Sequence, residues 1–302
     1  MKVLITGGTG FVGKVIVKQL LAAGDEVVIL TRNVGQAALS LGSQCKYFRW
    51  DDTNTLPPLE AFTGVEGVIN LMGETISKRW DENQKKKIYD SRIFGTKKLV
   101  EAIEQLPVKP KVFVSTSAIG IYGNRGSEEI TESSTLADDF LSKVCKDWEN
   151  EANKVKNAGL RVVIIRVGVV LGRGGGALEK LVPLFKLGAG GPVGTGLQYM
   201  SWIQVEDLAN MYCECLKNNT LKGVLNGTSP NPVTNAQFSK VLGKVLHRPA
   251  FMPAPAFALK LVLGEMSQIV LEGQKVLPTE FKKNNFRFQY PTLEMALKET
   301  TH

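Results

Sequence analysis

Length, composition and charge already exclude several kinds of protein. The chain has 302 residues, 43% of them hydrophobic and 22% charged, and no apolar run reaches the roughly 18 residues of a membrane-spanning helix, so we expect a globular protein without a membrane partner. The net charge of +8 favours anionic ligands, but the lysine run at 85–87 falls in a polar helix without a motif that reads nucleic acid, so nucleic acid is not an expected partner.

Strand-like and helix-like segments alternate along the first half of the chain. The predicted strands are 2–6, 26–30, 46–50, 67–71, 112–116 and 161–167, and the predicted helices are 14–23, 84–104 and 141–157. Gly24 stands where a helix that ends at residue 23 would need a left-handed residue. This alternation predicts an α/β protein of the Rossmann type, with a doubly wound parallel sheet.

The pattern changes after residue 167. Glycine clusters at 172–176 and 188–192 flank a predicted helix at 177–187, and they suit either loops that bend around a bound molecule or flexible surface loops. A helix at 205–217, which we expect Asp207 to cap, and a strand at 223–226 follow.

We therefore expect two domains. The first is a Rossmann domain over 1–167, to which 200–226 returns. The second is a smaller C-terminal substrate domain made from 168–199 and 227–302, and it is expected to close over the carboxyl ends of the strands, where open α/β sheets bind ligands.

The cysteines and the N-terminus indicate the compartment. Cys45, Cys145, Cys213 and Cys215 form no metal-binding pattern, so no metal is expected and the thiols are expected to be reduced. Met1 leads directly into a predicted strand, which leaves no room for a signal peptide. We expect a cytoplasmic protein.

A glycine-rich turn joins the first strand to the first helix. Its glycines fit both G-x-G-x-x-G, at 8, 10 and 13, and G-x-x-G-x-x-G, at 7, 10 and 13. Such a turn lets backbone approach a pyrophosphate while the N–H groups of the helix start face that anion. The expected cofactor-binding residues here are Gly7, Thr9, Gly10, Phe11, Val12 and Gly13.

The end of the second strand indicates which dinucleotide binds. NAD-binding proteins usually carry an acid there for the ribose 2′-hydroxyl, but this chain has Thr31 and Arg32. A guanidinium can hold a 2′-phosphate with two hydrogen bonds, so the sequence predicts NADP(H) as the cofactor. Asp51 is expected at the adenine amino group, and Leu71 and Met72 are expected beside the adenosine.

Several segments resemble a known family. Residues 6–13, 70–74, 115–117 and 122–123 resemble extended short-chain dehydrogenases/reductases of the sugar-nucleotide epimerase type. Residues 170–176, 190–192, 201–203 and 271–276 resemble a narrower, atypical branch of NADP-binding epimerase-family proteins that end in a C-terminal domain of unknown function. The resemblance implies cofactor contacts from Gly73, Arg92 and Ser115 as well.

The same resemblance implies catalytic residues. Superfamily members use Tyr-x-x-x-Lys as acid/base and a Ser that orients the substrate carbonyl. Ser117 matches the Ser. The Tyr-x-x-x-Lys pair does not occur: Lys143 at the lysine position puts Asp139 at the tyrosine position, whereas Cys145 at the lysine position puts Leu141 there.

Tyr122 is either a pocket wall or a replacement acid, so the candidate catalytic set is Ser117, Lys143 and Tyr122. The expected substrate side comprises Glu74, Arg79 and Gln204, which stands where close relatives often have His. Glu74 and Arg79 could instead form a structural ion pair.

Two functions fit these residues. The first is an NADP(H)-binding oxidoreductase or epimerase-like enzyme that acts on a small polar substrate without the usual Tyr-x-x-x-Lys pair. The second is a non-catalytic NADP(H)-binding redox sensor or partner-binding regulatory protein. The superfamily often forms homodimers through the long helices at 84–104 and 141–157, so a homodimer is expected by analogy.

Overall fold

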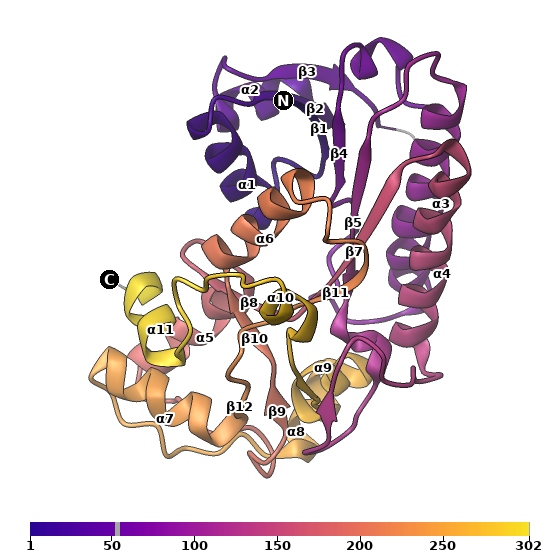
Figure 1. Cartoon of the computed structure of the whole chain (residues 1–302). Coiled ribbons are helices and arrows are strands. Elements are labelled where there is room, and N and C mark those ends of the chain that lie inside the picture. Colours follow the sequence, from indigo (N-terminus) through magenta and orange to yellow (C-terminus); the bar gives the residue numbers. More distant parts are fainter. Residues whose placement is uncertain (52–54, 302) are drawn as a thin grey trace.

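The computed structural model describes residues 1–51 and 55–301 and is built on one parallel sheet. Its seven strands lie in the order β11-β7-β5-β4-β1-β2-β3, which confirms the predicted doubly wound Rossmann fold (Figure 1). Their bounds are β1 (Lys2–Thr6), β2 (Glu26–Thr31), β3 (Lys46–Arg49), β4 (Gly67–Asn70), β5 (Val112–Ala118), β7 (Arg161–Val167) and β11 (Gly223–Gly227).

Helices cover both faces of the sheet. Alternate residues of β1 divide between two cores: Val3 and Ile5 face α1 and α6, whereas Leu4 faces α3. In Figure 1, α1 and α6 lie on one side of the sheet and the long pair α3 and α4 on the other. The bounds are α1 (Phe11–Ala22), α2 (Val34–Leu41), α3 (Glu82–Gln105), α4 (Phe140–Lys154), α6 (Val205–Lys217), η1 (Leu59–Phe62), η2 (Ile119–Tyr122) and η3 (Val155–Ala158).

The C-terminal part has its own apolar core. Leu178, Phe185, Phe238, Leu242 and Leu297 are buried together there. Its elements are β8 (Val169–Gly172), α5 (Gly176–Lys186), β9 (Tyr199–Met200), β10 (Trp202–Gln204), β12 (Val233–Thr234), α7 (Asn235–Leu246), α8 (Ala256–Leu263), η4 (Gly264–Ser267), α9 (Gln268–Leu271), β13 (Lys275–Val276), which pairs with β6 (Glu129–Ile130), α10 (Thr279–Lys283) and α11 (Leu293–Thr301). Among the described residues, no helix is long and apolar enough to cross a membrane.

The glycine cluster at 172–176 has a packing role. A Cβ built on Gly172 would lie 2.6 Å from the Phe11 ring, and one on Gly175 would lie 2.5 Å from it. Gly176 is nearly as close, at 3.0 Å. These glycines let the β8–α5 turn lie directly on the aromatic side chain that begins α1, so this turn is packed against the fold and is not a loose surface loop.

The predicted cap of α6 is wrong. The Gln204 side chain caps this helix, since its Oε1 accepts hydrogen bonds from the backbone N–H groups of Glu206 and Asp207. The fully buried Asp207 carboxylate instead accepts from the backbone N–H groups of Gln289 and Tyr290, at 2.8 and 2.9 Å. Asp207 therefore ties the C-terminal segment to α6 across 82 residues of sequence.

The contact between Phe11 and Gly175 makes a stability prediction. Gly175→Ala should lower the free energy of unfolding by about 1–3 kcal/mol, because the new methyl group overlaps the ring and forces a shift in a packed contact. The matched control is Gly35→Ala in α2, where the nearest atom is 3.7 Å away and alanine favours the helix. Urea unfolding of both variants is the measurement, and equal midpoints would contradict the packing role.

Candidate functional site

The turn from β1 to α1 has room for glycine only at two positions, Gly7 and Gly13. Gly7 adopts a φ of +69°, and a Cβ there would lie 2.8 Å from the carbonyl oxygen of Leu71. A Cβ on Gly13 would lie 2.3 Å from the carbonyl oxygen of Gly7. This turn is the strand–loop–helix geometry that a pyrophosphate site needs.

The N-terminus of α1 is open to an anion. Its N-cap is Gly10, which provides no side-chain cap, and no acidic residue stands in its first turn. The backbone N–H groups of Phe11, Val12 and Gly13 have no residue four positions earlier within the helix to bond to. Thr9 and Gly10 are exposed beside them, so the positive end of the helix dipole faces solvent.

Arg32 follows β2 at the carboxyl edge of the sheet, on the same edge as the glycine turn. Its side chain is exposed, and the Asn33 backbone N–H next to it bonds to Thr31 Oγ1 at 3.3 Å. Asp51, expected at the adenine, is exposed and accepts a hydrogen bond from Arg49 Nε at 3.0 Å. Leu71 and Met72 are half-buried after β4.

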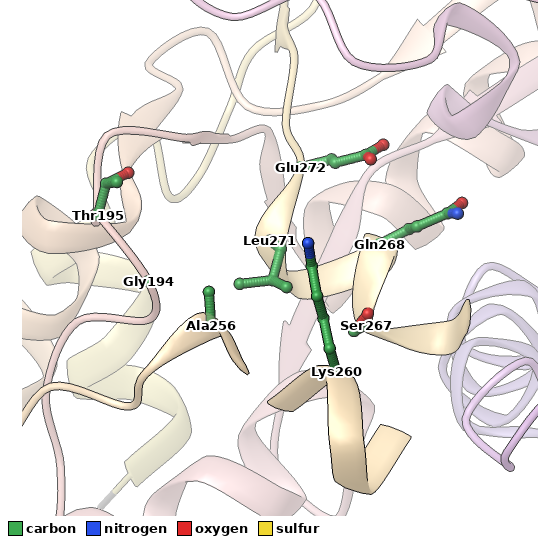
Figure 2. A pocket seen from close by; sticks show the side chains of 8 residues that line it. All are labelled: Gly194, Thr195, Ala256, Lys260, Ser267, Gln268, Leu271 and Glu272. Atoms are coloured by element: carbon green, nitrogen blue, oxygen red, sulfur yellow. The ribbon is translucent and has the colours of Figure 1, made fainter. Parts of the chain in front are cut away.

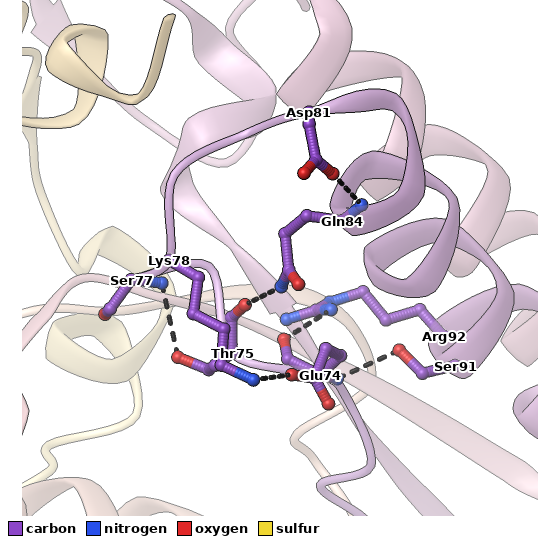
Figure 3. Close-up of polar contacts among 8 residues, drawn as sticks. All are labelled: Glu74, Thr75, Ser77, Lys78, Asp81, Gln84, Ser91 and Arg92. Atoms are coloured by element: carbon purple, nitrogen blue, oxygen red, sulfur yellow. Dashed lines mark hydrogen bonds and ion pairs between the residues drawn. The ribbon is translucent and has the colours of Figure 1, made fainter. Parts of the chain in front are cut away.

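Arg92 and the segment after β4 hold each other in place (Figure 3). Arg92 Nη1 donates to the carbonyl oxygens of Glu74 and Ile88, at 3.0 and 3.1 Å, and its guanidinium lies 5.2 Å from the centre of the Trp148 ring. A Cβ on Gly73 would lie 2.8 Å from the guanidinium carbon. The Nε and Nη2 groups of Arg92 have no partner among the described residues and are free to bind an anion.

Glu74 and Arg79 do not form the alternative ion pair. Glu74 pairs with Lys78 at 3.1 Å; burial alone would raise the pKa of Glu74, but Lys78 and Arg32 hold it below its usual range. Arg79 is exposed and lies near Gly264, since a Cβ there would be 3.6 Å from Arg79 Nε. The segment from Gly73 to Asp81 thus reaches from the sheet to η4 of the C-terminal part.

A buried polar network lies beneath Ser117. The Ser117 hydroxyl donates to Glu149 Oε1 at 2.7 Å, and Arg166 pairs with both Glu149 oxygens at 2.8 Å. Arg166 Nη1 also donates to the Tyr122 hydroxyl at 2.9 Å, which in turn donates to Asn226 Oδ1 at 2.8 Å. The network joins β5, η2, α4, β7 and β11, and sequence reasoning found neither Glu149 nor Arg166 as its centre.

This network removes Tyr122 as a replacement acid. Tyr122 is fully buried, and burial raises the pKa of its phenol although Arg166 opposes the shift. Its hydroxyl is occupied by Arg166 and Asn226, so it cannot meet a substrate. Tyr122 forms part of the internal support of the site.

Two other expected contacts also turn out to be structural. Ser115 is fully buried and accepts a hydrogen bond from Asn70 Nδ2 at 3.3 Å, within the sheet interior rather than beside the cofactor edge. Gln204, expected on the substrate side, is 2% exposed and caps α6. The Ser115 hydroxyl and the Gln204 Oε1 atom are therefore both bonded within the fold.

The two alignments of the missing pair place different side chains near Ser117. Lys143 is exposed, whereas the Cys145 thiol is buried beside Ser117 and near Arg92. The alignment with Cys145 at the lysine position and Leu141 at the tyrosine position is the one that would bring that pair next to Ser117. Burial, with the nearby Glu149 carboxylate, raises the pKa of Cys145 to about 11, so its thiol is neutral near pH 7.

Sequence comparisons cover nearly the whole chain. A family model described as the NAD dependent epimerase/dehydratase family matches residues 3–226, and a domain of unknown function (DUF1731) matches residues 254–300. "Epimerase family protein SDR39U1 homolog, chloroplastic" of Arabidopsis thaliana is 41% identical over 99% of this chain and 86% of that protein. "Epimerase family protein YfhF" of Bacillus subtilis is 39% identical over 99% of this chain and 97% of that protein.

A solved structure of high similarity carries a ligand. The crystal structure of human epimerase family protein SDR39U1 (isoform 2) with NADPH superposes with a TM-score of 0.89 at 36% identity, covering 99% of this chain and 98% of that one. UDP-glucuronic acid 4-epimerase from Bacillus cereus shares the fold at a TM-score of 0.80 and 17% identity, over 99% of this chain and 97% of that one.

The buried ion pair beneath Ser117 makes a stability prediction. Glu149→Gln should lower the free energy of unfolding by about 3–5 kcal/mol, because Arg166 is left as a buried charge without its counter-ion. Glu280→Gln, which breaks the solvent-exposed pair with Lys283, is the control and should have a much smaller effect. Urea unfolding distinguishes them, and similar losses in both variants would show that the network does not support the fold.

Proposed function

Because the chain belongs to the NAD dependent epimerase/dehydratase family, we propose that it binds NADP(H) at the carboxyl edge of the sheet. On this proposal it is an oxidoreductase or epimerase-like enzyme that acts on a small polar substrate. The observation that carries the proposal is the β1–α1 turn: it excludes every side chain at Gly13 and presents free backbone N–H groups at the sheet edge where β2 leads into Arg32. The NADPH in the human relative's structure supports the same reading.

Three groups would hold the cofactor. The N–H groups of Phe11, Val12 and Gly13 bind the pyrophosphate, because an uncapped helix start favours an anion. Arg32 binds the ribose 2′-phosphate through its planar guanidinium. Arg92 offers Nε and Nη2 to a second phosphate or ribose oxygen while its Nη1 stays bonded to backbone.

The cofactor supplies the hydride, and the chain's own residues position and shield the reacting groups. Three described candidates for the role of the family tyrosine do not suit it as an acid: Leu141 is apolar, Tyr122 is buried in its network, and burial raises the pKa of the Cys145 thiol to about 11. On this proposal a bound water molecule transfers the proton, because the Ser117 hydroxyl is fully buried and already donates to Glu149. Positioning next to the nicotinamide supplies most of the rate enhancement in such a site.

A second candidate is a non-catalytic NADP(H)-binding sensor. The pair Leu141 and Cys145 favours it, because both members of the usual acid/base pair are replaced. The sensor would use the same cofactor residues and pass the redox state to a partner. A cytoplasmic location and a homodimer complete either version of the proposal.

The role of Arg32 is testable by binding. Arg32→Ala should weaken NADPH binding about 10- to 100-fold and leave NADH binding nearly unchanged, because the lost hydrogen bonds are to the 2′-phosphate alone. Arg287→Ala, an exposed arginine in the C-terminal segment, is the matched control and should change neither affinity. Calorimetric titration measures both cofactors. Equal losses for NADPH and NADH would place Arg32 elsewhere on the dinucleotide.

Turnover separates the two candidate functions. The enzyme predicts that NADPH absorbance at 340 nm decays when a panel of small carbonyl compounds is added, and that Gly13→Val abolishes both the decay and NADPH binding by filling the space beside Gly7. A protein that binds NADPH tightly but oxidises it with none of the panel supports the sensor. A protein that binds neither cofactor contradicts both.

A further inference from the structure

The chain between β4 and α3 forms neither helix nor strand. We call residues 73–81 the strap; it follows the carboxyl end of β4, where the cofactor is proposed to bind, and it ends at Asp81, which caps α3. In the middle of the strap, Ser77, Lys78 and Arg79 are exposed. Because no strand ladder holds this segment, its position depends on the few contacts that side chains make with it.

Side chains of α3 hold the first part of the strap (Figure 3). Ser91 Oγ accepts a hydrogen bond from the backbone N–H of Glu74 at 2.9 Å, and Arg92 Nη1 donates to the carbonyl oxygen of Glu74 at 3.0 Å. Gln84 Nε2 donates to the carbonyl oxygen of Thr75 at 2.8 Å. The first part of the strap is therefore fixed to α3 through its own backbone.

The C-terminal part holds the middle of the strap through fewer contacts. Lys180 Nζ on α5 donates to the carbonyl oxygen of Ser77 at 3.1 Å, and both residues are exposed. Met266 of η4 lies in one apolar cluster with Ile76 and Trp80 of the strap. A single exposed hydrogen bond contributes little net free energy, so the contact between the strap and α5 can break and form again.

Helix η4, which meets the strap, is not packed tightly on its other side. A half-open cavity of about 270 Å³ lies between the η4–α9 segment, α8 and the loop at 194–195 (Figure 2). Ser267 at the end of η4 and Gln268 at the start of α9 line this cavity. Because atoms that face an empty space have no contacts on that side to lose, η4 can shift together with the strap.

Arg92 joins the strap to the proposed cofactor site. Its Nη1 holds the Glu74 carbonyl, whereas its Nε and Nη2 groups have no partner among the described residues. A Cβ on Gly73 would lie 2.8 Å from the guanidinium carbon, so the strap packs directly on this group. Burial would raise the pKa of Glu74, but Lys78 and Arg32 lower it, so the second arginine proposed to bind a phosphate also lies near the strap.

We propose that the strap couples cofactor binding to the C-terminal part. A phosphate on the free nitrogens of Arg92 fixes the guanidinium that holds Glu74, and the fixed strap then keeps Ser77 against Lys180. Lys180 is thus a positioning residue that acts on the cofactor only through the strap. The proposal rests on the proposed function and adds how the C-terminal part responds to the cofactor. Because coupling is reciprocal, Lys180 must strengthen NADPH binding as much as NADPH strengthens the contact between Lys180 and the strap.

Brief trypsin digestion of the full chain tests this coupling, because Lys78 and Arg79 are exposed cleavage sites in the strap. Saturating NADPH should slow cleavage after both residues by about fivefold or more, whereas cleavage after Lys222, exposed between α6 and β11, should not change. Lys180→Gln should restore part of the strap cleavage in the presence of NADPH and weaken NADPH binding about two- to tenfold in calorimetric titration. A lysine that only stabilised the fold would leave this affinity unchanged.

The matched control is Lys186→Gln, which changes an exposed lysine at the other end of α5 and should bind NADPH as the unchanged chain does. Lys180→Arg can still donate to the Ser77 carbonyl and should keep the affinity for NADPH. Equal strap cleavage with and without NADPH, in a chain that calorimetry shows to bind it, would overturn the coupling and leave the proposed function intact. So would equal NADPH affinities of Lys180→Gln and Lys186→Gln. A chain that binds no NADPH contradicts the proposed function and the coupling together.

Discussion

The start of α1 packs between the β1–α1 turn and the β8–α5 turn, and at both contacts a Cβ on the glycine would be too close to its neighbour. Gly13 lies over the Gly7 carbonyl, where a Cβ would be 2.3 Å from the oxygen, and the Phe11 ring fills the space left by Gly172 and Gly175. One helix turn therefore meets two requirements. It keeps N–H groups open to an anion, and it anchors the C-terminal part against the sheet. Any change that moves α1 disturbs both.

The sheet could be predicted because its strands are covered on both faces and so read as continuous apolar runs, such as 161–167. The short strands β8, β9, β10 and β12, of two to four residues, could not, because they are shorter than any periodic signal and depend on tertiary pairing. The role of Asp207 was predicted wrongly for a similar reason. An acid near the start of a helix resembles an N-cap, whereas the hydrogen-bond partners of Asp207 lie 82 and 83 residues away in the sequence.

The candidate site also has a part that the sequence predicts and a part that it does not. The glycine turn and Arg32 are recognisable locally, since a strand, a loop and a helix follow one another in the chain. The network of Glu149, Arg166 and Tyr122 is not, because its members come from three separate elements and meet only when β5 and β7 pair. A sequence shows that an acid and an arginine exist, but not that they share one buried contact.

This network also bears on the chemistry. In the usual superfamily site, the serine and the tyrosine meet the substrate together. Here the Ser117 hydroxyl donates to Glu149 Oε1, the Cys145 thiol is buried beside it, and neither alignment of the missing pair has a tyrosine. Arg166 pairs with both Glu149 oxygens and orients the side chain toward Ser117, so the Ser117 hydroxyl proton is used within the network. Ser117 is also fully buried, so in this structure its hydroxyl belongs to the Glu149–Arg166 network and is not presented to a substrate carbonyl as the serine of the usual site is.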